Sequence, residues 1–364
     1  MRILAIDLGK HKSVACDYRT TTGEHRFTKL PTRPQALHDL IVQREPDRVV
    51  IEVGNQAGWI KDLCDTLEVP IQVANPNHDA WRWKRVKRKT DRDDALKLAQ
   101  LSAVGQLPLV SVPSRGVRQW RSLIHYRGKL VNRRTAIRNS IRALLDREGL
   151  TLPAGKRGWS KAMLQQLQEM SRPIDQVDMD QLWRGQLAVE LTALQQIQAL
   201  LDQVEAKLNR IASADERVRR LRTIPGVGAR LAETVVAMID DPHRFKSRRE
   251  VAAYAGLVPR QFESGTLNRH GRITGAGPKQ LRALLVEIAW LSRRYNPHFA
   301  AVFEQTRRGS RTRGKIAAVA TARRLLITCW AMLRDQTDWQ APNTPPPTPQ
   351  TGPTPATTRT GATA

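Results

Sequence analysis

Acidic residues are scarce in this chain. Its 364 residues include 34 Asp and Glu against 60 Lys and Arg, which gives a formal net charge of +26 at pH 7. A polyanionic partner explains such a basic soluble protein most simply, and nucleic acid is the partner we expect. The length is enough for two or three domains with proper cores.

Long apolar runs and paired cysteines are also missing. No run approaches the span of a bilayer, and the N-terminus enters a predicted strand directly, so we expect no membrane association and no signal peptide. The three cysteines, Cys16, Cys64 and Cys329, are far apart and odd in number. They lack zinc-site spacing and suit small apolar residues in a reducing cytoplasm.

The first 105 residues alternate between short apolar runs and helical patterns. Strands are predicted over residues 2–7, 13–18 and 25–30, with a hairpin turn at 21–24 between the last two. Helix, strand, helix and strand then follow over 34–44, 48–53, 56–67 and 70–74, and residues 75–77 open a further helix. Three meander strands followed by alternating helices and strands predict an α/β domain of the ribonuclease H-like type.

Two acids lie in the strands of this predicted domain. Asp7 ends the first strand, and Glu52 lies in a strand rich in Val and Ile. A strand buried on both faces leaves a carboxylate in need of a cation. Ordinary roles stay open for both residues, because Asp7 fits a turn beside glycine and Glu52 fits an edge strand facing water.

Two more acids, Asp91 and Asp94, are three residues apart and share one face of a helix. Here too an ordinary role is open, since Thr90 and Asp93 imitate a capping box and acids favour a helix N-terminus. However, a basic segment with two tryptophans runs straight into these acids. We expect its cations to bind nucleic acid: Arg82, Lys84, Arg85, Lys87 and Arg88. Carboxylates beside such a segment suit Mg²⁺ or Mn²⁺ held against a scissile phosphate.

Asp7, Glu52 and the run Thr90-Asp91-x-x-Asp94-Ala95 resemble the DEDD tetrad of the IS one-ten family of insertion-sequence transposases. These proteins are bridge-RNA-guided recombinases whose N-terminal domain is similar to the Holliday-junction resolvase RuvC. The resemblance implies a RuvC-like catalytic domain over residues 1–105. It also implies that Asp7, Glu52, Asp91 and Asp94 are catalytic and bind Mg²⁺ or Mn²⁺.

No acid occurs between Ala95 and Leu145, while basic residues punctuate a helical pattern whose other face is apolar. A solvated face would mix charges of both signs, so this positive face indicates phosphate contacts. The candidates are Arg118, Arg121, Arg127, Arg134 and Arg138. The resemblance implies that residues 106–150 form a helical extension that grips the guide RNA.

Residues 151–180 are rich in Pro, Gly and Gln and are predicted to form a connector. Over residues 181–215, leucines recur every seven residues at 187, 194, 201 and 208, and Ile197, Val204 and Ile211 follow three residues after the last three of them. This pattern is typical of a two-stranded coiled coil. The alternative is a helix that packs within its own chain. The resemblance implies dimerisation through this segment, and we expect a dimer or a tetramer.

Residues 216–335 are predicted to form a mostly helical transposase domain. The run 222–229 resembles a helix-hairpin-helix turn, in which Gly226 and Gly228 let backbone amides approach a DNA phosphate. The run Gly-Leu-x-Pro-Arg…Glu-Ser-Gly over 256–265 matches the family's second motif, which carries its nucleophilic serine. That serine is Ser264, which without the resemblance would be an ordinary loop serine. The cations expected to offset phosphate charge are Arg260, Arg269 and Arg272.

Residues 336–364 are predicted to form a disordered tail, which is Pro- and Thr-rich from 341 onward.

These features predict a DNA recombinase in which the metal orients a phosphodiester of donor or target DNA and Ser264 attacks it. Three rival hypotheses stay open. A RuvC-like endonuclease would use the same tetrad with water as the nucleophile. A sugar kinase or actin-like ATPase shares the run Ile-Asp-Leu-Gly-Lys over 6–10, although the sequence shows no second Asp-x-Gly phosphate loop. A non-catalytic RNA-binding protein would need no tetrad at all.

Overall fold

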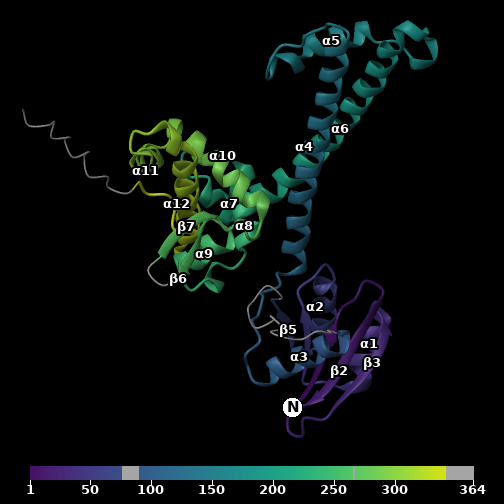
Figure 1. The fold of residues 1–364 in the computed structure, drawn as a ribbon, viewed down its shortest axis with the longest axis vertical. Helices are drawn as coiled ribbons and strands as arrows, with labels where there is room; N and C mark the ends of the chain where they lie inside the picture. Colours follow the sequence, from purple (N-terminus) through teal and green to yellow (C-terminus); the bar gives the residue numbers. More distant parts are fainter. Residues whose placement is uncertain (76–89, 265–266, 342–364) are drawn as a thin grey trace, which may run out of the picture. The chain divides into compact units, whose positions relative to one another are not determined.

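A computed structural model describes residues 1–75, 90–264 and 267–341, without the side chains of 262–264 and 267–270. The chain forms two compact units, Met1–Lys129 and Leu130–Ala364 (Figure 1). The basic segment 81–89 and the tail from 342 onward lie outside the described residues, so the predictions made for them stay predictions.

The N-terminal unit is built on a five-stranded sheet of order β3-β2-β1-β4-β5 (Figure 1). β1, β2 and β3 form an antiparallel meander, and β4 and β5 continue the sheet parallel to β1. The strands are β1 (Arg2–Asp7), β2 (Lys12–Arg19), β3 (His25–Pro31), β4 (Arg48–Glu52) and β5 (Ile71–Ala74). This arrangement is consistent with the predicted ribonuclease H-like domain.

Helices cover both faces of this sheet. α1 (Pro34–Arg44) and α2 (Ala57–Thr66) pack on the face that carries Leu4, Ile6 and Ile51. α3 (Asp91–Ala103) packs on the opposite face, against Ile3, Ala5 and Val50. β1 and β4 are therefore apolar on both faces, as expected of central parallel strands.

One ion pair ties the start of β1 to β2. The guanidinium of Arg2 donates to both carboxylate oxygens of Asp17, at 2.8 and 2.6 Å, and Arg44 of α1 lies 3.9 Å from the same carboxylate. The hydrogen bond from Arg2 holds the pKa of Asp17 below its ordinary value. The pair therefore stabilises the fold only while Asp17 is ionised.

We expect Asp17→Asn to lower the stability of the sheet at pH 7 by about 1–2 kcal/mol, the range for a partly buried charged hydrogen bond. The pKa of Asp17 is lower in the folded state than in the unfolded state. The stability lost in Asp17→Asn should therefore be full above the unfolded-state pKa and should vanish as the pH falls through the folded-state pKa. Hydrogen exchange of the β1 and β2 amides measures it. Asp65→Asn, which breaks an exposed pair with Lys61, is the control. A loss that stayed constant down to low pH would contradict the assignment.

The second unit begins with a helical hairpin. α4 (Arg115–Arg147) starts in the first unit, and its part from Leu130 onward packs against α6 (Leu182–Ala214) (Figure 1). The two helices are antiparallel, because Arg134 bonds Gln198 whereas Ser140, further along α4, bonds Glu190, which lies earlier in α6. The predicted connector 151–180 contains α5 (Lys161–Met170), whose Leu167 joins the hairpin core. It also contains the 3₁₀ turns η2 (Arg157–Trp159), η3 (Ile174–Gln176) and η4 (Met179–Gln181).

The leucine repeat of α6 is buried within its own chain. Leu187, Leu194 and Leu201 pack against Leu130, Ile141, Leu144 and Leu145 of α4 in one apolar cluster. The seam therefore packs as the intramolecular alternative expects, and pairing of this segment with a second chain stays a prediction. The periodicity identified the buried face correctly.

The rest of the second unit is a helical bundle with one hairpin. Its elements are α7 (Glu216–Leu221), α8 (Ala229–Ile239), η5 (Pro242–Arg244), α9 (Arg248–Tyr254), β6 (Pro259–Ser264), β7 (Leu267–Ile273), α10 (Lys279–Tyr295), α11 (Pro297–Arg307), η6 (Arg311–Arg313) and α12 (Gly314–Asp335). α12 packs against α10 and α11 and also contacts α7 and α9. The indole of Trp330 on α12 donates to the carbonyl of Pro242 at 2.8 Å.

The run Arg311–Asp335 is long and apolar enough to cross a membrane, which corrects the expectation that no segment is. Length and composition alone are weak evidence, because 56% of its apolar window is buried inside the structure. A core helix of a bundle passes the same test.

The position of the leucine repeat gives a second prediction. Leu201 is 1% exposed, whereas its neighbour Leu200 is 42% exposed on the other face of α6. Leu201→Glu should destabilise the hairpin by several kcal/mol, because it places an unpaired charge in the apolar cluster. Leu200→Glu should change stability by less than about 1 kcal/mol. Thermal unfolding followed by circular dichroism measures both variants. If Leu201→Glu kept the wild-type unfolding temperature but halved the particle mass in light scattering, the seam would instead pair with a second chain.

Candidate active site and nucleic-acid interface

Two of the predicted catalytic acids end neighbouring parallel strands. Asp7 is the last residue of β1, and Glu52 is the last residue of β4. The register pairs Ile6 with Ile51, so Asp7 and Glu52 occupy the next position on each strand. The sheet therefore brings two acids that are 45 residues apart in sequence to the same edge.

Both acids belong to the sheet face that α3 covers. Side chains alternate along a strand, so Asp7 follows Ile3 and Ala5, and Glu52 follows Val50. Those three apolar residues share a cluster with Ala95 and Leu98 of α3. The side chains of Asp7 and Glu52 are each half-buried.

α3 brings the other two acids to this face. Ala95, Leu98 and Ser102 are buried along one stripe of the helix, and Asp91 and Asp94 continue that stripe into its first turn. Asp94 is half-buried and Asp91 is exposed. α3 packs against β1, β2 and β4, so its first turn belongs to the face on which both strand acids lie.

Asp93, which lies between these two acids, has a different role. The hydroxyl of Thr90 accepts from the backbone amide of Asp93 at 3.3 Å, and the amide of Thr90 donates to the Asp93 carboxylate at 3.0 Å. This is a capping box, and its hydrogen bonds lower the pKa of Asp93. The capping interpretation is therefore confirmed for Asp93, and Asp91 and Asp94 are left for another role.

The donor set suits a hard divalent cation, since all four side chains offer carboxylate oxygens. Within the described residues, no three His, Cys, Asp or Glu side chains lie close enough together to hold a metal. Two of the acids lie at one sheet edge and two on the helix that covers the same face, so a cation bound there would offset their repulsion. The fold thus brings the tetrad to one face of the sheet, and the ligand geometry itself stays a prediction.

Ser264 is the last residue of β6, where the sequence alone indicated a loop. Its backbone pairs with Leu267 across the two-stranded hairpin, so Ser264 lies next to the turn. Arg260 and Arg272 are exposed on the same hairpin. The side chains of Ser264 and Arg269 lie outside the described residues.

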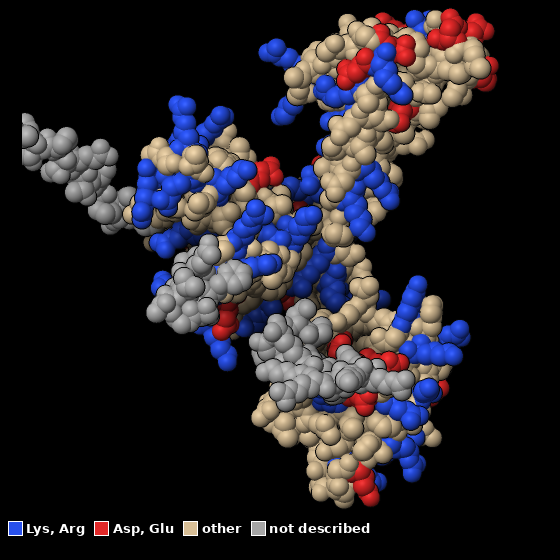
Figure 2. Space-filling model, in the orientation of Figure 1, with Lys and Arg blue, Asp and Glu red and all other residues tan. Residues whose placement is uncertain are grey.

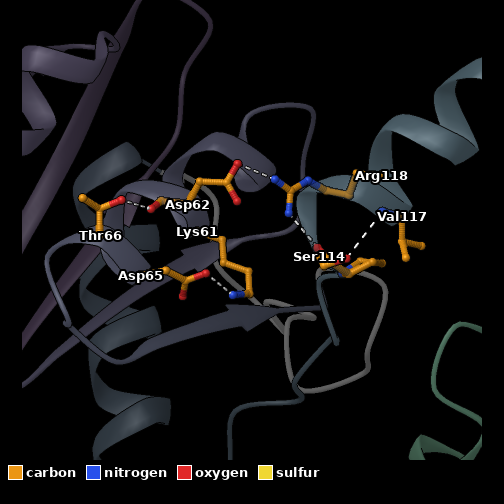
Figure 3. Close-up of polar contacts among 8 residues, drawn as sticks. Lys61, Asp62, Asp65, Thr66, Ser114, Val117 and Arg118 are labelled. Atoms are coloured by element: carbon orange, nitrogen blue, oxygen red, sulfur yellow. Dashed lines mark hydrogen bonds and ion pairs between the residues drawn. The ribbon is translucent and has the colours of Figure 1, made fainter.

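Arg118, a predicted phosphate contact, binds within the N-terminal unit. Its guanidinium donates to the carboxylate of Asp62 on α2 at 2.5 Å and to the carbonyl of Pro113 at 2.6 Å (Figure 3). Gly58 makes room for it, because a Cβ there would lie 2.8 Å from the Arg118 Nε. Arg118 therefore has a structural role that joins α4 to α2, and its contact with nucleic acid stays a prediction.

Two further predicted contacts, Arg134 and Arg138, also have partners inside the helical hairpin. Arg134 donates to the Gln198 side chain at 3.0 Å, and Arg138 lies 5.0 Å from the centre of the Trp159 ring. Burial lowers the pKa of Arg138, with Arg134 and Arg142 contributing. Arg121 and Arg127 are half-buried on the same helix, and their contact with RNA stays a prediction.

The predicted helix-hairpin-helix turn lies between two helices, α7 and α8. Gly226 has a φ of +88°, a conformation that favours glycine, and a Cβ there would lie 3.3 Å from Tyr295. Gly228 is the N-cap of α8 and supplies no capping side chain. The local backbone agrees with the prediction, and its contact with DNA phosphate is untested.

The sequence did not predict a groove in the second unit that is lined by four arginines. Arg248 and Arg249 at the start of α9 line one cavity of about 550 Å³ together with Arg323 and Arg324 of α12. No acidic residue lines it, and none of the four guanidiniums makes a hydrogen bond or ion pair within the described part of the chain. Figure 2 shows many basic and few acidic side chains over this bundle. The two Arg-Arg pairs were visible in the sequence, but only the fold brings them together.

Comparison with known families gives matches in both units. The family described as "Transposase IS116/IS110/IS902 family" matches residues 218–304. The model for DEDD transposases of the IS110 type, described as "Transposase", matches residues 4–149. Together the two matches cover more than half of the chain.

Several relatives match along most of the chain. The transposase for insertion sequence element IS1111A of Coxiella burnetii is 28% identical over 289 residues, which are 79% of this chain and 77% of the relative. A probable family 20 transposase of Pseudomonas aeruginosa is 27% identical over 340 residues, 93% of this chain and 98% of the relative. A pilin gene-inverting protein of Moraxella lacunata is 25% identical over 275 residues, 72% of each chain.

The two family matches cover the unit that brings four acids to one sheet face and the unit that carries the serine hairpin and the four-arginine groove. The chain therefore belongs to the IS116/IS110/IS902 family of insertion-sequence transposases, and its N-terminal unit is the family's DEDD domain.

Proposed function

We propose that this transposase cuts and rejoins DNA strands through attack by Ser264, with a divalent metal bound by Asp7, Glu52, Asp91 and Asp94. The observation that supports the metal site is the parallel register of β1 and β4, which brings Asp7 and Glu52 to one edge of the sheet, on the face that α3 covers. Mg²⁺ or Mn²⁺ bound there would neutralise and orient the scissile phosphate. The family membership supports DNA as the substrate.

In the proposed reaction, the Ser264 oxygen forms an ester bond with the phosphorus, and the bond from phosphorus to the leaving sugar oxygen breaks. The serine proton passes to a base, and the leaving oxygen takes up a proton to become a free hydroxyl. The phosphoserine ester conserves the bond energy, so a hydroxyl of another strand can attack it and rejoin DNA without an external energy source. Removal of the serine proton by a base is needed because the serine hydroxyl is a weak nucleophile at neutral pH.

The remaining parts of the proposal concern the partners. Donor and target DNA are held by basic side chains, among which the four-arginine groove has the strongest structural support, because its cations are uncompensated. A bridge RNA that selects the sites, and a homo-oligomer whose protomers share the catalytic groups, remain proposals from the resemblance. Because the leucine seam of α6 is buried against α4, a contact between protomers through this segment would use its exposed face.

The competing function is a RuvC-like endonuclease that uses water instead of serine. Both mechanisms need the tetrad, and only the serine mechanism leaves the protein covalently attached to DNA. A denaturing gel of a reaction with labelled donor DNA separates them.

The tetrad is best tested within a single helical turn. Asp91→Asn and Asp94→Asn should each reduce strand cleavage by at least about 100-fold while leaving nucleic-acid affinity nearly unchanged, because each removes a charged ligand of the metal. Asp93→Asn is the matched control, since it makes the same chemical change one position away and an amide oxygen can still cap the helix. Cleavage assays in Mg²⁺ and in excess chelator measure the effect. Full cleavage in chelator would falsify the metal assignment.

Ser264→Ala tests the nucleophile. It removes one oxygen at the end of β6, so the fold and the affinity for nucleic acid should hardly change, while strand exchange and covalent adducts should both disappear. Ser213→Ala, at an exposed serine that bonds only its own helix, is the control. Near wild-type strand exchange by Ser264→Ala would assign the attack to water or to a DNA 3′-hydroxyl.

A further inference from the structure

One cavity of the N-terminal unit has no role in the chemistry proposed above. It measures about 780 Å³. Its walls come from α2, from the first two turns of α4, from segment 53–55 after β4 and from segment 110–113 before α4. Segment 53–55 follows Glu52 directly, so one wall of the cavity continues from a candidate metal ligand.

The Arg118–Asp62 ion pair forms part of the lining of this cavity. Both residues line it, and the carbonyl of Pro113 holds the same guanidinium (Figure 3). The carboxylate of Asp62 is thereby neutralised, so no uncompensated negative charge faces the cavity. An anionic ligand can therefore enter it.

The remaining lining combines three kinds of groups. Trp59 is half-buried against the sheet core, and its ring makes no stacking or cation–π contact within the described residues. Arg115 is exposed and makes no ion pair in that part of the chain. The polar side chains of Asn55, Ser111 and Gln119 likewise make no hydrogen bond there.

We propose that this cavity binds one unstacked nucleotide of a single-stranded nucleic acid. A planar base packs against Trp59, the amides and the hydroxyl bond its edge, and Arg115 binds its phosphate. Bases within a duplex are stacked and cannot enter, so the ligand is an unpaired or extruded nucleotide. The inference rests on the proposed nucleic-acid function and gives the cavity a positioning role, since segment 53–55 of its wall follows Glu52 directly in the chain.

Three measurements on the full chain test this site. The first is the affinity for a single strand of DNA, for the RNA strand of the same sequence and for the matching DNA duplex. Ser111→Trp fills the cavity from an exposed position and should weaken single-strand binding about tenfold, the loss expected for one stacked base. Its control is Ser122→Trp, at an exposed serine of α4 that does not line the cavity.

The second measurement concerns the cation. Arg115→Gln should weaken single-strand binding several-fold and lower its salt dependence by about one phosphate contact. Arg26→Gln removes the same charge from an exposed position on β3 that does not line the cavity, and it should have less than half of that effect.

The third measurement is photo-crosslinking of the wild-type protein with strands that carry one 4-thiothymidine or 4-thiouridine. Crosslinked peptides should contain Trp59 or segment 110–113. A crosslink from DNA alone would assign the site to the substrate strand, and one from RNA alone would assign it to a guide.

The proposal is overturned if Ser111→Trp binds single strands with wild-type affinity, if duplex binding falls equally, or if crosslinks map elsewhere. These outcomes do not depend on cleavage. Failure of the serine mechanism would instead appear as strand exchange by Ser264→Ala with the crosslink intact.

Discussion

The burial of β1 and β4 between two layers of helices is the constraint on which the candidate catalytic face of this structure depends. Adjacent strands lie about 4.8 Å apart, and β1 and β4 end side by side in Asp7 and Glu52. The sheet holds these acids in place through Ile3, Ala5 and Val50, which are fully buried beneath α3. Core packing thus fixes these two acids side by side at one edge of the sheet.

The same constraint explains the first turn of α3. Three acids stand at its N-terminus, where the helix dipole favours negative charge, and only Asp93 is used as a cap. Capping by Asp93 orients the turn so that Asp91 and Asp94 continue the stripe that Ala95 and Leu98 bury. The helix start therefore stabilises acids whose mutual repulsion would be harder to accommodate elsewhere.

Much of the N-terminal unit was predictable because its signals are local. Pro34 at the first turn and the left-handed Glu45 after Arg44 bound α1, which spans the predicted residues. The order of strands follows from the meander and the parallel crossovers, and so does the neighbourhood of Asp7 and Glu52. The partner of an amphipathic face was not predictable. The seven-residue repeat of α6 identifies the buried side chains, but Leu144 of α4 and a second copy of α6 would satisfy the same periodicity.

Arginines show most clearly why the site could be predicted only in part. The sequence contains many guanidiniums without nearby acids, and it does not distinguish those that brace the fold from those that await a ligand. Arg118 has its acid 56 residues away, in Asp62, and Gly58 leaves the space that the guanidinium fills. Arg115, three residues earlier on the same helix, has no such partner within the described residues. One turn of α4 therefore contains both a structural arginine and an uncompensated one. Only the second retains a charge that nucleic acid would neutralise, so compensation by the fold is a better guide to the binding surface than the number of positive residues.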